Sequence, residues 1–409
     1  MRERSYMIVI PKDEKYVNSP NYFMENLKNN ERIQIENAGM DDERGLVVDL
    51  KIDNLQYQIE VNPTAVEIPN MFRPQHVFSE EEIKLIDNAE AGISVNMDFE
   101  GDNARCFYDQ IRIIDAMFPE ILAVLDCPSE KLLSGKWVSL AAKSDIMPSP
   151  RYLFTVQAVS DGDDEVWLHT HGLKRLGMYE LEILFSNKET YNDHYKIIEN
   201  FAIRMIESEE PIEIGEPVYV GQSGEMYLVC TAVDWKEALD YYKDVKLGIE
   251  EDRDEFHSED TCVIMMYKNK DDADNRIYTP VQEFDPYLEK NPMYMFSSAE
   301  TERMSNLAIE RIPYMVKGFE NKDNTILVKV GLITDKEYWN DDGTPQREHI
   351  WFELKDIKDG IIVAELTQEP YYVSNIKTGD VGTYSFEEIT DWIIYTKTGH
   401  ITPDDVYLM

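Results

Sequence analysis

Cysteine is scarce in this chain of 409 residues, and its four thiols never form a Cys-x-x-Cys pair. Each of them has apolar neighbours in the sequence; they are Cys106, Cys127, Cys230 and Cys262. This usage excludes a disulfide framework and the paired-thiol type of zinc site, and it is typical of reduced cysteines that pack as small hydrophobes. We therefore expect a protein of a reducing compartment, the cytoplasm.

Basic residues are also few, because 40 Lys and Arg stand against 80 Asp and Glu and leave a formal net charge of −40. A negative field of this size repels nucleic acid and anionic lipid surfaces, so we expect neither as a partner. It favours a basic protein, a cationic ligand or metal ions. The alternative is that the acidity only keeps an abundant protein soluble. The charge indicates no particular oligomeric state.

Long apolar runs and the common catalytic signatures are missing as well. No apolar stretch has the length that crosses a membrane, and the five apolar residues before Pro11 are too few for a signal peptide. Both glycine patterns of phosphate-binding loops are absent, and Gly221-Gln-Ser-Gly224 lacks the Gly-x-Ser-x-Gly elbow. We expect no membrane association, no cofactor and no catalytic residues, which favours a role other than catalysis.

The residues that are present predict a folded protein, since 43% are apolar and 11% aromatic. Alternating apolar positions predict strands such as Met7–Ile10, and Asp53-Asn54 predicts a hairpin turn. Ser79 and Asp102 precede segments with helical spacing, as residues that cap helices do. Together these patterns predict an α+β protein of several domains. We expect largely antiparallel, curved sheets with helices packed on one face.

Two interruptions of regular pattern predict the domain boundaries. Pro and Gly break the pattern over residues 211–217, and a second linker-like stretch covers residues 280–292. We therefore predict an N-terminal α+β domain over 1–212, with a subdomain split near 120–150, and a small middle α/β unit over 213–294. A C-terminal α+β domain follows over 295–409. In it we expect a helix over 299–316, a small β-barrel-like unit, and a short helix over 387–394.

One short stretch carries residues of chemical interest at a meaningful spacing. In Trp167-Leu-His-Thr-His171 the two histidines are two positions apart and would share one face of a strand. Glu180 and Glu182 would do the same on the next strand. Two imidazoles and the carboxylate of Glu180 could hold a metal ion, and they could equally form the polar face of a half-buried hairpin. The remaining histidines join no motif.

The acidic run from Glu250 to Glu255, which His257 follows, offers a second pattern to weigh. It lacks the alternating oxygen ligands and the central glycine of a calcium loop. We interpret it as a solvated loop or helix end.

Aromatic residues single out the C-terminal domain as a binding surface. His349, Trp351 and Glu353 alternate on one predicted strand, and Tyr371 and Tyr372 follow. Exposed aromatic side chains make good anchors for a protein partner. The alternative is that the tryptophans are core residues, which we prefer for Trp392 because its neighbours are largely apolar.

The C-terminal domain resembles a bacterial family catalogued as domain of unknown function 2314. The similarity rests on several segments in a fixed order: 314–319, 348–353, 360–366, 370–373, 379–381 and 388–392. The family supplies no catalytic residues to carry over. Most of the remaining chain resembles a second family, domain of unknown function 4026.

Residues 168–183 are in addition similar to a motif of suppressor-of-fused-like domains. Those domains bind partner proteins, and bacterial members are associated with immunity to secreted toxins. The resemblance implies a protein-binding role for the histidine hairpin. The similarity covers Leu168-His-Thr-His-Gly-Leu173 and Glu180-Leu-Glu-Ile183, with Gly177 between them.

These observations lead to three hypotheses of function. We expect a non-enzymatic, intracellular bacterial protein that binds a basic protein partner, in the manner of a toxin-immunity factor. The first alternative is a metal-dependent enzyme that uses His169, His171 and Glu180. The second is a structural scaffold of an operon-encoded complex.

Overall fold

The computed structural model describes residues 3–17, 19–118, 120–160, 162, 164–208, 210–254, 257 and 259–409. Within them the chain divides into two compact units. Unit 1 comprises residues 1–143 and 147–295, and unit 2 comprises residues 144–146 and 296–409. The main boundary therefore follows Met295.

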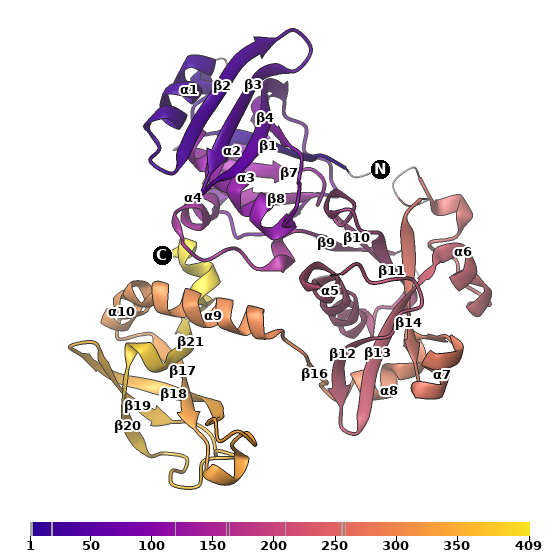
Figure 1. Cartoon of the computed structure of the whole chain (residues 1–409), viewed down its shortest axis with the longest axis vertical. Helices are drawn as coiled ribbons and strands as arrows, with labels where there is room; N and C mark the ends of the chain where they lie inside the picture. The colour runs from indigo at the N-terminus through magenta and orange to yellow at the C-terminus, as the bar shows by residue number, and fades with distance from the viewer. Residues whose placement is uncertain are drawn as a thin grey trace. The chain divides into compact units, whose positions relative to one another are not determined.

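The first half of unit 1 is built on a mixed sheet that residues 5–134 form (Figure 1). Its order is β2-β3-β4-β6-β1-β7-β8-β5, and its pairs are antiparallel except for β5 with β8. Its strands are β1 (Ser5–Pro11), β2 (Ile33–Asp41), β3 (Gly45–Ile52), β4 (Leu55–Ala65), β5 (Arg73–Pro74), β6 (Ala91–Met97), β7 (Ile121–Asp126) and β8 (Lys131–Ser134). Its helices are α1 (Pro20–Asn29), α2 (Glu80–Asp87), α3 (Asn103–Met117) and α4 (Gly135–Lys143).

Helices lie against both faces of this first sheet. Ile86 of α2 packs with Ile8 and Ile10 of β1. On the other side Gln110 of α3 accepts a hydrogen bond from Ser5 Oγ over 2.6 Å. Because Ser5 and Ile8 have opposite parity along β1, their side chains point to opposite faces of the sheet. The predicted single helical layer thus describes only part of this half.

The second half of unit 1 is another mixed sheet, formed by residues 155–294. Its order is β16-β12-β13-β14-β11-β10-β9, with β15 paired to β14. Its strands are β9 (Thr155–Ser160), β10 (Glu165–His171), β11 (Glu180–Asn187), β12 (Val218–Ser223), β13 (Met226–Asp234), β14 (Thr261–Tyr267), β15 (Thr279–Pro280) and β16 (Met293–Tyr294). Its helices are α5 (Tyr191–Glu207), α6 (Trp235–Ala238), α7 (Lys270–Asn275) and α8 (Asp285–Leu288).

A parallel pair joins segments on either side of the predicted boundary at 212. β11 pairs with β14 in register Leu181 to Cys262. The strands after the predicted boundary at 212 therefore continue the sheet that begins with β9. The break in pattern at 211–217 marks a connection within one sheet, because loops that join distant strands use the same turn residues as linkers.

Unit 2 is an α+β fold with an antiparallel sheet of order β20-β19-β18-β17-β21-β22. The sheet is open, so the predicted barrel-like shape is corrected. Its elements are α9 (Ser298–Glu310), α10 (Ile312–Glu320), β17 (Thr325–Ile333), β18 (Arg347–Lys358), β19 (Ile361–Leu366), β20 (Val381–Ser385), β21 (Ile389–Thr396) and β22 (Gly399–Ile401). The predicted helix over 387–394 is wrong, since β21 occupies most of it and pairs with both β17 and β22.

Trp392 fastens this strand to the core of unit 2. Its side chain is fully buried beneath α9, and its indole Nε1 donates a hydrogen bond to the carbonyl of Ala308 over 3.0 Å. The expectation that Trp392 is a core residue is confirmed. No helix in the described part of the chain combines the length and the apolar character that crossing a bilayer requires.

Candidate metal centre

The histidine stretch forms strand β10, which lies between β9 and β11. His169 faces Gln157 of β9 on one side and Glu182 of β11 on the other. Alternate residues of a strand share a face, so His169 and His171 project together. Their ring centroids are 4.9 Å apart, and Trp167 packs against His169 at 4.6 Å. The predicted hairpin thus places both imidazoles on one face of the sheet.

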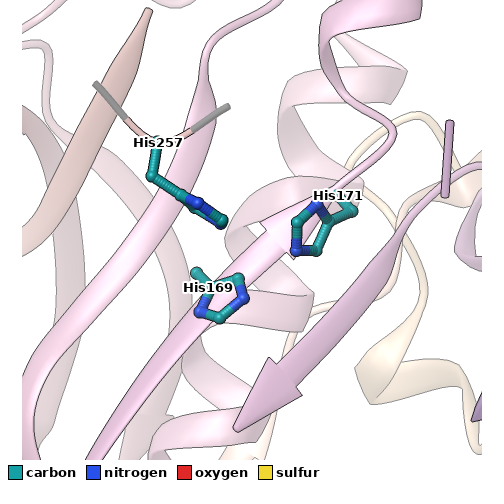
Figure 2. A group of neighbouring side chains, drawn as sticks. All are labelled: His169, His171 and His257. Carbon is teal, nitrogen blue, oxygen red and sulfur yellow. The ribbon is translucent and has the colours of Figure 1, made fainter. Parts of the chain in front are cut away.

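A third imidazole completes the group, and it comes from far along the chain. The ring of His257 lies 4.7 Å from that of His169 and 5.1 Å from that of His171, measured between centroids. Figure 2 shows the three rings around one common space. One nitrogen from each ring lies within 4.8 Å of the others. Within the described part of the chain, these three residues form the group of metal-ligating side chains whose ligand atoms lie close enough together to hold one ion. We call it the histidine cluster.

An acidic neighbour fixes the protonation of His257. The Nδ1 atom of His257 and Oδ1 of Asp254 are 2.8 Å apart, so the ring donates its Nδ1 proton to the carboxylate. The lone pair of the imidazole is then on Nε2. A carboxylate bound to the far nitrogen of a histidine is the usual outer partner of a metal ligand, because it orients the ring and increases its basicity.

Two nitrogens of the cluster are buried without a hydrogen bond from the described residues. They are Nδ1 of His169 and Nε2 of His257. By contrast, the buried His194 uses both of its nitrogens, with Ser186 Oγ at 2.7 Å and Asp285 Oδ1 at 2.8 Å. A buried polar atom normally has a partner, because leaving it without one costs about 1–3 kcal/mol. The cluster therefore has two nitrogen atoms that are available to a ligand.

Burial keeps the three imidazoles neutral. It lowers the pKa of His171 to about 3, and neighbouring His257 lowers it further. Burial also lowers the pKa of His169 and of His257, although Asp254 acts in the opposite direction on His257. Neutral imidazole is the form that binds metal ions, so the ring nitrogens do not have to lose a proton first.

Glu130 brings a carboxylate to the edge of the cluster. Its Oε1 is 3.7 Å from Nδ1 of His171, and its other oxygen accepts a hydrogen bond from the amide of Gln157. Its backbone has a φ of +51°, a left-handed conformation that is uncommon outside glycine. The turn between β7 and β8 thus directs this side chain toward His171.

Arg253 connects the cluster to the sheet through a buried ion pair. Its guanidinium donates to both carboxylate oxygens of Glu182, over 2.8 and 2.7 Å, and both side chains are almost completely buried. The same group donates to the carbonyl of His257 over 2.7 Å. Of the two predicted glutamates, Glu182 therefore acts on the position of His257 through Arg253.

Glu180, the carboxylate that the sequence pattern groups with the two histidines, belongs to a different set of contacts. Its carboxylate accepts hydrogen bonds from Thr170 Oγ1 at 2.7 Å and from the backbone N–H groups of Gly172 and Lys174 at 2.9 and 3.1 Å. Burial raises its pKa to about 7, against the effect of these donors. The loop after β10 folds back onto Glu180, so this carboxylate holds the loop and His257 takes its place in the candidate set.

The remaining predicted residues lie in unit 2. His349 and Trp351 share the outer face of β18, opposite the buried Ile350 and Phe352, and His349 Nδ1 lies 3.0 Å from Thr390 Oγ1. The predicted alternation along this strand is thus observed.

Tyr371 and Tyr372 follow β19 and are exposed by 81% and 48%. Both backbone N–H groups donate to the carboxylate of Glu348 over 2.8 Å. Tyr338 packs on Tyr372 with ring centroids 4.8 Å apart. We call these three residues the tyrosine patch; it is fixed by its backbone and presents its rings to solvent.

Sequence reasoning missed His257 because nothing near it in the chain points to β10. The acidic run before it predicted a solvated loop. Glu255 and Phe256 lie outside the described residues. The one available signal was the short spacing from Asp254 to His257, which places a carboxylate within reach of an imidazole.

Family models identify three regions of the chain. The N-terminal model of the protein of unknown function DUF4026 matches residues 5–148, and its C-terminal model matches residues 156–265. The model of DUF2314, an uncharacterized protein conserved in bacteria, matches residues 306–402. No curated protein and no solved structure matches the chain. The whole histidine cluster lies inside the second region. Both family resemblances are confirmed: the chain belongs to the DUF4026 family and carries a DUF2314 region after it.

Proposed function

We propose that this protein binds one divalent transition-metal ion through His169, His171 and His257. The observation that carries the proposal is the convergence of three neutral imidazoles, two of which have a buried nitrogen without a hydrogen bond from the described residues. The buried His194, by comparison, has a hydrogen-bond partner for each of its ring nitrogens. A metal ion would provide the missing partner.

The spacing of the nitrogens supports this proposal. Zinc binds imidazole nitrogen at about 2.0–2.1 Å in a tetrahedral shell, which places two ligand nitrogens about 3.4 Å apart. The three nitrogens of the cluster lie within 4.8 Å of one another. A shift of about 1 Å of each ring toward the common centre would therefore close the site.

The ligand set favours zinc, copper, nickel or iron, since imidazole suits these metals and magnesium and calcium prefer oxygen ligands. Three histidines leave a fourth position on a tetrahedral ion, which is the arrangement of catalytic rather than structural zinc sites. Glu130, whose Oε1 is 3.7 Å from Nδ1 of His171, would supply a fourth ligand or accept the proton of a bound water. Metal-dependent catalysis at this open position is the alternative hypothesis for the function of the site.

Titration of the metal-free, tag-free chain with Zn²⁺ in a calorimeter tests the proposal. We expect one ion per chain, and we expect His257→Ala to weaken binding by about 100-fold or more, because a direct ligand counts for more than an outer partner. His349→Ala is the matched control, since this exposed histidine lies in unit 2. Equal zinc binding by wild type and His257→Ala would contradict the proposal.

The tyrosine patch supports a second candidate function, binding of a basic protein. Exposed rings held by a fixed backbone make anchors with a small entropic cost, and a cation of the partner can stack on them. The net charge of −40 would attract such a partner and accelerate its association. An immunity role, with a basic toxin as the partner in the cytoplasm, is the specific form of this candidate.

Affinity capture from native lysate at low salt, followed by identification of the retained proteins, tests this candidate. We expect one basic protein that wild type retains, and that the Tyr371→Ser/Tyr372→Ser variant and a high-salt wash release. Retention of the same proteins by the variant would contradict a role of the patch.

A further inference from the structure

A pocket of about 980 Å³ lies in unit 1 on the hairpin of β12 and β13. Its walls also include the end of β14, one side of α7, Tyr287 of α8 and Lys290 after that helix. We call it the hairpin pocket. It shares no residue with the histidine cluster. Binding of a ligand in this pocket would therefore not depend on a metal ion in the histidine cluster.

The walls of the hairpin pocket are mainly aromatic and apolar. Tyr219 and Tyr227 meet edge to face at 5.9 Å between centroids, and both are exposed, by 37% and 60%. Two of the polar atoms in the lining are already engaged within the fold. The hydroxyl of Tyr267 donates to the carbonyl of Gly215 over 2.8 Å, and Ser223 Oγ donates to the carbonyl of Tyr287 over 2.6 Å. What remains for a ligand is largely ring faces and aliphatic carbon, supplied also by Met226 and Val229.

The lining of the pocket is far less acidic than the chain as a whole. The lining has three lysines and two carboxylates, Lys268, Lys270, Lys290, Glu225 and Asp274, which gives a local charge of +1. The chain as a whole carries −40. Lys268 forms an ion pair with Glu283, and the ammonium of Lys290 lies 5.5 Å from the ring centre of Tyr287. Lys270 has no carboxylate partner among the described residues.

We propose that the hairpin pocket binds a small amphipathic anion, a molecule with an aromatic or aliphatic body and one carboxylate or sulfonate. The volume is at the upper end of the range for small-molecule sites, about 300–1,000 Å³, and such sites combine apolar walls with a few polar groups. The body stacks on Tyr219 and Tyr227. The anionic group pairs with Lys270 and Lys290, which offset the repulsion by the rest of the chain.

Two matched probes test this assignment on the full-length chain. The anion 1-anilinonaphthalene-8-sulfonate and the uncharged N-phenyl-1-naphthylamine share their aromatic body and differ in the sulfonate. We expect the sulfonate to bind more tightly to the wild type. Lys270→Glu/Lys290→Glu should weaken its binding about tenfold, because two close attractions become repulsions, and should leave the uncharged probe unaffected. Tyr227→Ala should weaken both probes.

The control variant is Tyr395→Ala, which removes a ring of unit 2 that is 44% exposed and should change neither affinity. Equal binding of the two probes, or sulfonate binding that the lysine variant leaves unchanged, would overturn the anion assignment. Sedimentation measured at several protein concentrations tests whether a second copy of this chain, and not a small molecule, occupies the pocket. A dimer that Tyr227→Ala dissociates would overturn the proposal in favour of a second copy of this chain.

Discussion

Arg253 is the side chain that connects His257 to the sheet, and Arg253→Met would remove this connection while keeping most of the apolar stem. The guanidinium is 1% exposed and its partner Glu182 is fully buried. It donates to both oxygens of Glu182 and to the carbonyls of Gly248 and His257. The substitution leaves the buried carboxylate of Glu182 without its cation.

Two effects of different size follow from these contacts. Breaking a buried ion pair by removing one partner costs about 3–5 kcal/mol, so the free energy of unfolding of the metal-free protein should fall by about that amount. His257 also loses the donor that holds its carbonyl. Loss of an outer partner typically lowers metal affinity by about 10–100-fold, and we expect a reduction of zinc affinity in that range.

Urea unfolding followed by tryptophan fluorescence measures the first effect, since Trp235 lies 3.9 Å from the guanidinium carbon of Arg253. Calorimetric titration with Zn²⁺ measures the second. The control is Arg303→Met, which breaks a two-point ion pair with Glu300 in unit 2 at 2.7 and 2.9 Å. It should lower stability and leave zinc affinity unchanged. Wild-type zinc affinity in Arg253→Met, or an equal loss in Arg303→Met, would refute the reasoning.

Three further substitutions give distinct expectations. His76 accepts a hydrogen bond from Ser134 N at 3.1 Å and has a pKa lowered by burial to about 3. In the unfolded chain His76 takes up a proton near pH 6.5, whereas in the folded chain it does so only near pH 3. The free energy of unfolding therefore falls by about 1.4 kcal/mol per pH unit as the pH falls from 6.5 toward 3. His76→Asn should show a shallower fall between pH 6 and 5, and parallel curves for wild type and variant would contradict this. Gly172→Ala should cost about 1–3 kcal/mol in urea unfolding, because φ is +112° and a Cβ would lie 2.6 Å from the carbonyl oxygen of Leu153; a wild-type midpoint would count against it. Glu180→Gln should keep zinc affinity within about twofold, since Glu180 holds the loop after β10, and a loss above about tenfold would return it to the ligand set.

Local chemistry accounts for the parts of the fold that could be predicted. Ser79 and Glu82 form the reciprocal cap at the start of α2, and Asp102 caps α3 by accepting from the backbone of Arg105. Asp53 and Asn54 both have positive φ, as a two-residue hairpin turn requires. Each of these features depends on residues within a few positions of one another, so sequence spacing was sufficient.

Contacts between distant segments account for what could not be predicted. The segment that forms β21 has an apolar spacing that fits a helix as well as a strand, and its pairing with β17 decides the outcome. In the histidine cluster, β10 supplied two members that the alternation of a strand made visible. The third, His257, is brought to β10 because Arg253 holds its carbonyl and pairs with Glu182 of β11, 71 positions earlier in the chain, and that long-range pairing leaves no mark in the local pattern.

The identity of the atoms around a bound ion tests the central claim most directly. X-ray absorption at the zinc edge of the full chain, loaded with one equivalent of Zn²⁺, reports the number and kind of the nearest ligands. Three imidazole nitrogens at about 2.0–2.1 Å, with one further light atom, are the predicted result, and the imidazole signal should fall in His257→Ala. A shell of oxygen atoms alone, the same in wild type and variant, would contradict the account.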